Sequence, residues 1–163
     1  MVGRFLAGIG AVVWAPTQAR YVLLQRSPEK DFAPGVWECV TGRVDQGEGF
    51  TEALVREVRE ELGVTVEADF VIGTTHFYRG TSQPDNELLG VVYHCSLSTP
   101  EAVRLSAEHT AVRWVTLTEA RDVLRPENPS EAWLLRVLER ATKLRTLLPT
   151  EVIEMQRLGM EMG

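Results

Sequence analysis

Three glutamates within a stretch of five residues are the part of this sequence best suited to chemistry. Glu57, Glu60 and Glu61 are spaced so that a helix would set them on one face. Their mutual repulsion would destabilise a bare helix, and a bound divalent cation would remove that penalty. Carboxylate oxygens suit magnesium, manganese or calcium, whereas zinc prefers nitrogen and sulfur ligands. The spacing therefore predicts a site for a hard cation.

The segment 50–62 has the features of a helix that would hold these carboxylates. It contains neither proline nor glycine, and apolar residues recur along it at every fourth position. Gly63 follows at the place where a helix would end in a left-handed cap. A solvated acidic face with internal ion pairs is the ordinary interpretation of a Glu-rich helix, because charge runs usually face water. The fixed spacing across residues 42–64 favours the cation site instead.

The wider pattern runs from Gly42 to Val64. It reads Gly, five residues, Glu, seven residues, Arg-Glu, an apolar residue, any residue, Glu-Glu, any residue, Gly, an apolar residue. This stretch resembles the signature box of the Nudix hydrolases at every defined position. The resemblance implies an α/β fold, namely a Nudix-type α/β/α sandwich with a mixed β-sheet. It also implies magnesium-dependent hydrolysis, with manganese as a substitute, of a nucleoside diphosphate linked to another moiety.

The resemblance assigns the metal ligands and a general base. Glu57, Glu60 and Glu61 would bind the metal, and the backbone carbonyl of Thr41 would join them. The base is either Glu57 or Glu108, because a loop glutamate has that role, or ligates a further metal, in several branches of the family. A solvated position in a turn is the alternative for Glu108.

The remaining positions of the box have supporting roles in the family. Arg56 would hold box carboxylates in place, including Glu48. Gly42 and Gly63 would serve through their backbone, one at the loop and one at the helix end. Many relatives carry Pro-Gly-Gly here, whereas this chain has a threonine directly before Gly42, which reduces backbone freedom without removing the carbonyl.

Two arginines are candidates for binding substrate phosphate. Arg26 ends a strand-like run, where the family often places an arginine against phosphate, and a planar guanidinium suits phosphate oxygens. Arg43 directly follows the first glycine of the box. Solvated surface positions are the alternative for both.

The elements that would position these groups alternate between strand-like and helical patterns. We expect strands over 5–14, 20–25, 36–41, 65–78 (as one bent strand or two), 88–97 and 111–115, and loops over 27–35 and 80–86. Thr118 is expected to cap a short helix, and Ser130 to begin a longer amphipathic one. The tail after Pro149 is compatible with a helix on a partner subunit or with a frayed end.

The whole chain suits one soluble domain. It has 163 residues, 44% hydrophobic and 25% charged, which is ordinary for a single core. We expect residues 1–149 to form the domain and 150–163 to be its tail or a short helix. The net charge of −6 and the lack of a long basic patch argue against binding to duplex nucleic acid.

Localisation and partners follow from what the sequence lacks. The apolar start, residues 1–13, does not have the pattern of a signal peptide, and no run is long enough to span a bilayer. Cys39 and Cys95 lie in apolar segments and are expected to be buried free thiols of a reducing compartment. We therefore expect a cytoplasmic protein with a small-molecule partner and no membrane contact. A homodimer is compatible with the sequence but is not fixed by it.

The substrate stays open among several classes. They are a nucleoside triphosphate, dihydroneopterin triphosphate, a dinucleoside polyphosphate, ADP-ribose and another sugar nucleotide. The segments Val40-Thr41-Gly42 and Glu108-His109 are similar to the dihydroneopterin triphosphate pyrophosphatase branch, which favours a triphosphate. A non-catalytic nucleotide-binding module is the alternative class, but such proteins typically lose box carboxylates and this chain keeps them all.

Overall fold

Seven strands form one mixed sheet in the computed structural model, which describes residues 3–163. The strands are β1 (Leu6–Ala15), β2 (Arg20–Arg26), β3 (Trp37–Glu38), β4 (Val40–Arg43), β5 (Glu67–Tyr78), β6 (Glu87–Ser96) and β7 (His109–Val115). The α-helices are α1 (Phe50–Leu62), α2 (Leu117–Val123), α3 (Pro129–Leu147) and α4 (Thr150–Arg157), and short 3-10 turns cover Pro84–Asn86 and Pro100–Ala102.

Strand β1 organises the sheet because it pairs along both edges. One edge runs parallel to β6, which in turn pairs antiparallel with β5. The other edge is divided, since Gly8–Ala11 pairs with β4 whereas Trp14 and Ala15 pair with β2. The sheet therefore divides on this side of β1. Strand β4 leads into α1, whereas β2 pairs with β3 and β7.

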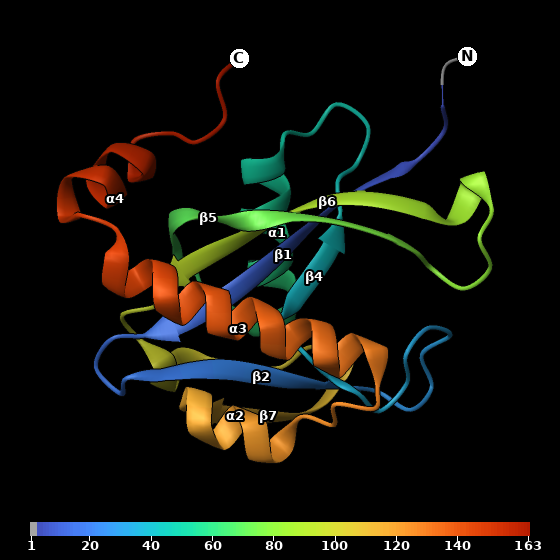
Figure 1. Cartoon of the computed structure of the whole chain (residues 1–163), viewed down its shortest axis with the longest axis horizontal. Helices are drawn as coiled ribbons and strands as arrows, with labels where there is room; N and C mark the ends of the chain where they lie inside the picture. Colours follow the sequence, from blue (N-terminus) through green and yellow to red (C-terminus); the bar gives the residue numbers. More distant parts are fainter. Residues whose placement is uncertain (1–2) are drawn as a thin grey trace.

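Period-two alternation along β1 separates two apolar cores. Ile9, Ala11 and Val13 belong to the core beneath α1, whereas Val12 and Trp14 belong to the core shared with α2 and α3. Figure 1 shows α3 crossing in front of the sheet and α1 behind it. The expected α/β/α sandwich with a mixed sheet is thus confirmed.

Several boundaries differ from the sequence expectations for local reasons. The segment expected as one strand over 36–41 is two strands, because the chain leaves its pairing with β2 at Cys39 and then pairs with β1. Thr116, rather than Thr118, caps α2, since only Thr116 has a glutamate three residues later to complete a capping box. Helix α3 begins one residue before Ser130, with Asn128 as its cap.

The C-terminal tail is a helix packed on its own sheet. Helix α4 lies against β5, so this part of the tail is an ordered helix and is not frayed. Both cysteines are buried free thiols, as expected. Within residues 3–163, no helix combines the length and the apolar character needed to cross a bilayer.

Candidate active site

Helix α1 presents one face to the core and another to a cleft. Leu54, Val58 and Leu62 are buried, which fixes the rotation of the helix about its axis. Gly63 ends the helix with φ of 67°, and its N–H donates to the carbonyl of Arg59. This left-handed conformation explains the glycine at that position of the box.

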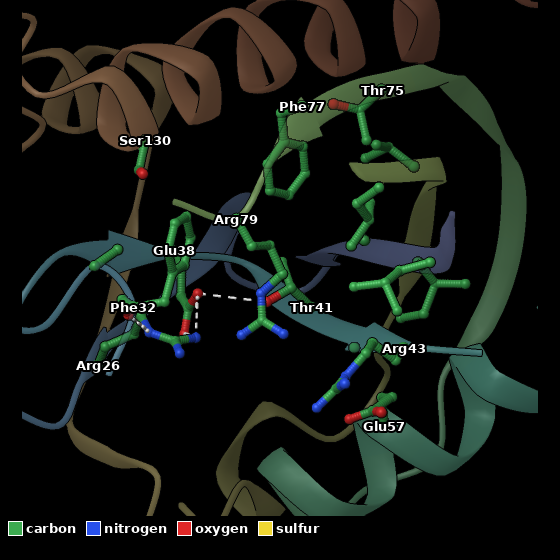
Figure 2. Close-up of a pocket in the computed structure, with 18 of the residues that line it drawn as sticks. Arg26, Phe32, Glu38, Thr41, Arg43, Glu57, Thr75, Phe77, Arg79 and Ser130 are labelled. Atoms are coloured by element: carbon green, nitrogen blue, oxygen red, sulfur yellow. Dashed lines mark hydrogen bonds and ion pairs between the residues drawn. The ribbon is translucent and has the colours of Figure 1, made fainter. Parts of the chain in front are cut away.

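A cleft of about 1080 Å³ lies where β1, β4, α1 and the ends of β5 and α3 meet. It contains most of the residues singled out from the sequence, as Figure 2 illustrates for the part nearest β4. The expected site residues that line it are Arg26, Thr41, Gly42, Arg43, Glu57, Glu60, Glu61 and Glu108. Residues separated by more than eighty positions in the chain are therefore brought to one surface.

Arg56 links the box carboxylates. Its Nε and Nη2 atoms donate to the two carboxylate oxygens of Glu48, each at 2.8 Å, and Nη1 donates to Glu57 at 2.7 Å. The same guanidinium also donates to the carbonyl of Arg43 at 2.9 Å. Hydrogen bonds from Arg56 lower the pKa of Glu48 to about 2, so Glu48 is ionised at neutral pH. Arg56 and Glu48 lie together as the family resemblance implies.

Glu57, Glu60 and Glu61 of α1 differ in how deeply they are buried. The Glu57 side chain is 14% exposed, that of Glu60 is 58% exposed and that of Glu61 is 7% exposed. Among residues 3–163, no three acidic, histidine or cysteine side chains surround a common point as metal ligands do. Gathering all three carboxylates around one cation would therefore require their side chains to rotate.

The chemistry of these donors nevertheless suits a cation. Oε2 of Glu61 is buried and accepts no hydrogen bond. Burial, together with the nearby carboxylates of Glu38 and Glu57, raises the pKa of Glu61 to about 9. Burial also raises the pKa of Glu57, against the opposing effect of Arg56. A hard cation coordinated by oxygen would satisfy the orphaned atom and relieve this crowding of acids.

Gly42 is required by the position of Glu57. A Cβ atom at Gly42 would lie 2.0 Å from the carboxyl carbon of Glu57, far inside contact distance. The glycine thus leaves the space in which the Glu57 carboxylate rests against β4. Thr41, the preceding residue, donates its hydroxyl hydrogen to Glu38 at 3.4 Å.

The two predicted phosphate ligands differ in their surroundings. Arg26 closes β2, but its Nη1 donates to both oxygens of Glu38, at 3.0 and 3.1 Å, and its Nε donates to the carbonyl of Phe32. Arg26 is therefore held against the cleft wall by an ion pair, which the sequence did not reveal (Figure 2). Arg43 is exposed on the side of the cleft formed by β4 and α1.

Glu38 is a member of the site that sequence reasoning missed. Besides Arg26 and Thr41, it interacts with Nε2 of the buried His109 at 2.9 Å. The available signal was an acidic residue in the middle of an otherwise apolar strand-like segment. Glu108 also lines the cleft, and Lys30 forms an ion pair with it at 2.7 Å. That contact lowers the pKa of Glu108.

Two aromatic rings, those of Phe32 and Phe77, also line the cleft. Phe32 and Phe77 are nearly parallel, with an interplanar angle of 22° and ring centroids 6.4 Å apart. The guanidinium of Arg79 lies 5.5 Å from the centre of the Phe32 ring. All three side chains line the same cleft as Glu57 (Figure 2). Phe32 could not be identified from the sequence because it lies in an irregular loop.

Comparison with known proteins relates this site to named relatives. The NAD-capped RNA hydrolase NudC of Pseudomonas aeruginosa is 36% identical over 101 residues, covering 62% of this chain and 34% of NudC. The dihydroneopterin triphosphate diphosphatase of Escherichia coli is 40% identical over 58 residues, covering 36% of each protein. This chain spans only 29% to 36% of the length of the first of these curated relatives.

Structural similarity covers more of the chain. The MutT protein from Methanosarcina mazei Go1 superposes with a TM-score of 0.69 at 22% identity, covering 89% of this chain and 98% of that one. At that identity the likeness concerns the fold. The NUDIX domain profile matches residues 4–138, which include the box, the residues that line the cleft and most of both cores. The chain therefore belongs to the Nudix family.

Proposed function

We propose that this protein is a metal-dependent pyrophosphohydrolase that cleaves a phosphoanhydride bond in a nucleoside diphosphate linked to another moiety. The observation that carries the proposal is a cleft lined by Glu57, Glu60 and Glu61, with a buried, unsatisfied oxygen on Glu61. Modules that only bind nucleotide typically lose box carboxylates, whereas this chain keeps them all.

Glu57, Glu60 and Glu61, with the Thr41 carbonyl, are proposed to hold magnesium, and manganese would fit the same oxygen donors. When bound, such an ion neutralises phosphate charge and makes water more acidic. Arg56 and Glu48 keep the Glu57 carboxylate at the β4 wall through the hydrogen bonds described above. Arg43 is available for a phosphate oxygen, whereas Arg26 would have to share its guanidinium with Glu38.

We assign the general base to Glu57 rather than Glu108. Lys30 is bonded to Glu108 and lowers its pKa, which makes that carboxylate a weaker base. In the metal-free site, burial acts in the opposite sense on Glu57 and raises its pKa. Glu57→Gln should therefore reduce the turnover number by more than about 100-fold, and Glu108→Gln by much less. Equal losses in the two variants would contradict the assignment.

The substrate proposed is a triphosphate that carries a planar ring, either a nucleoside triphosphate or a related compound such as dihydroneopterin triphosphate. Phe32 and Phe77 offer apolar faces to such a ring, and Arg79 adds a cation beside them.

A panel of phosphoanhydrides tests the substrate class. It would contain nucleoside triphosphates, dihydroneopterin triphosphate, ADP-ribose, diadenosine polyphosphates and inorganic tripolyphosphate, which has no ring. We expect the lowest KM for a ring-bearing triphosphate, and we expect Phe32→Leu with Phe77→Leu to raise that KM without changing turnover of tripolyphosphate. Equal efficiency for substrates with and without a ring would contradict the ring contact.

A further inference from the structure

The N-terminus of α1 lacks a side-chain cap from its own neighbourhood. The first N–H groups of any helix have no partner inside it, and a polar side chain at the N-cap normally accepts from one of them. Gly49 occupies the N-cap and has no side chain, and Glu52 accepts only the N–H of Gly49 itself. The N–H groups of Phe50 and Thr51 therefore need an acceptor from elsewhere.

Glu161, near the end of the chain, is that acceptor. Its Oε1 accepts the N–H of Phe50 at 3.0 Å and its Oε2 accepts the N–H of Thr51 at 3.1 Å. These bonds lower the pKa of Glu161, so a negative charge stands at the positive end of the helix dipole at neutral pH. A Cβ atom at Gly49 would lie 2.7 Å from a Glu161 oxygen, so the tail sits directly on the glycine.

The approach of Glu161 is determined by anchors on β5. Arg157 at the end of α4 donates two hydrogen bonds to the buried carboxylate of Asp69, at 2.9 and 2.6 Å, and pairs with Glu67. Gln156 accepts the N–H of Val71. Met160 then packs against the apolar core under α1. The tail therefore contacts β5 through Gln156 and Arg157, and it contacts α1 and the core beneath it through Met160 and Glu161.

This contact lies next to the active-site network. Gly49 directly follows Glu48, which holds Arg56, and Arg56 in turn holds Glu57. A displacement of the first turn of α1 would move Glu48 relative to Arg56 and so disturb the hydrogen bonds that hold Arg56. The tail itself lies outside residues 4–138, the part of the chain that matches the NUDIX domain profile.

We propose that residues 158–163 form a brace for the metal-binding helix and that Glu161 is a positioning residue for the active site. Glu161 acts through Glu48 and Arg56 and touches neither substrate nor metal. The catalytic consequence rests on the proposed hydrolase function, whereas the consequence for the geometry of α1 does not.

Substitutions in the full-length chain test the brace. Glu161→Ala removes both hydrogen bonds, and Glu161→Gln keeps one acceptor but loses the charge. Glu154→Ala is the matched control, because it removes the same charge from an exposed position of α4 that has no bond to α1. The turnover number, the KM and the magnesium concentration for half-maximal rate would be measured for each, beside the melting temperature.

We expect Glu161→Ala to lower the turnover number by between about threefold and tenfold, as a small misplacement of catalytic groups does, with KM changed by less than about twofold. The half-maximal magnesium concentration should rise, Glu161→Gln should be intermediate and Glu154→Ala should match the wild type. A lower melting temperature with wild-type turnover and magnesium dependence would show that Glu161 only stabilises the helix, and would overturn the proposal.

A second measurement separates the brace from the proposed function. If the wild type hydrolyses nothing in the panel, magnesium affinity is measured by calorimetry, together with hydrogen exchange of the Phe50 and Thr51 amides. Weaker magnesium binding and faster exchange in Glu161→Ala would support the brace without any hydrolysis. Unchanged magnesium affinity would overturn it.

Discussion

At the scale of single residues, a missing Cβ atom determines where a carboxylate can lie. The Glu57 carboxyl group fills the space beside Gly42, and Arg56 holds it there from the other side. The atoms that an added methyl group would meet all belong to the end of a flexible side chain. An alanine at this position would therefore move Glu57 and leave the backbone in place.

Gly42→Ala should separate activity from stability. We expect turnover to fall by about 10- to 100-fold because Glu57 is displaced, while the melting temperature stays close to that of the wild type. Gly73→Ala in β5 is the matched control, since its nearest neighbour would be 3.9 Å away and it lies outside the cleft. Enzyme assays and thermal melts of both variants make the comparison, and wild-type turnover in Gly42→Ala would refute the steric argument.

Residues whose role depends on local spacing were predictable, and those that depend on folding were not. The box predicted α1 from Phe50 to Leu62 and placed Glu57, Glu60 and Glu61 on it. The ion pair of Arg26 with Glu38 joins different strands, so no local pattern could indicate it. Phe32 reaches the cleft from a loop, where side-chain direction has no periodicity.

At the scale of elements, one buried carboxylate joins α3 to the strands that lead into the box. Glu131 is fully buried, and its oxygens accept the N–H of Trp37 at 3.0 Å and the N–H of Arg125 at 2.7 Å. The Arg125 guanidinium also donates to both oxygens. Burial alone would raise the pKa of Glu131, but the hydrogen bonds from Arg125 and Trp37 lower it, so this acid stays ionised.

Removing that carboxylate should cost stability. We expect Glu131→Ala to lower the free energy of unfolding by about 2–4 kcal/mol, because buried N–H groups lose their acceptor. Glu139→Ala, on the outer face of the same helix in an exposed pair with Arg121, should change it by less than about 1 kcal/mol. Urea denaturation measures both, and similar values for the two variants would contradict the role given to Glu131.

Boundaries of elements were predictable where the signal was local. Helix α1 has its terminal glycine in the sequence, and its end was expected correctly. The separation of β3 from β4 arises because consecutive residues pair with two different strands, which is a property of the assembled sheet. The packing of α4 on β5 was not predictable for the same reason, because it depends on Asp69, which is distant from α4 in the sequence.

At the scale of the whole molecule, a buried polar cluster makes stability depend on pH. Asp69 accepts hydrogen bonds from His94 and Ser96, at 2.8 and 2.6 Å, in addition to those from Arg157. Burial alone would raise the pKa of Asp69, but these bonds lower it. Burial lowers the pKa of His94, against the effect of Asp69. In both groups the pKa is lower in the folded state than in the unfolded chain.

Stability should therefore fall as the solution is acidified. The contribution of His94 is complete above about pH 6.5, its unfolded pKa, and that of Asp69 above about pH 3.9. Each is lost as the pH falls through the folded value. His94→Phe keeps the stacking on Phe70 but cannot titrate, so its unfolding free energy should vary less between pH 7 and pH 5. His76→Gln, at a half-exposed site, is the control, and an unchanged slope in His94→Phe would contradict this account.

The central claim is that the carboxylates on α1 support metal-dependent cleavage of a phosphoanhydride. The most direct measurement is release of phosphate or pyrophosphate from the best substrate of the panel by the wild type and by Glu60→Gln, each with magnesium and with a chelator. Glu60 is exposed, so its substitution should leave the fold intact. We predict that the chelator abolishes turnover and that Glu60→Gln reduces it by at least about 100-fold. Wild-type turnover by Glu60→Gln at saturating magnesium would contradict the account.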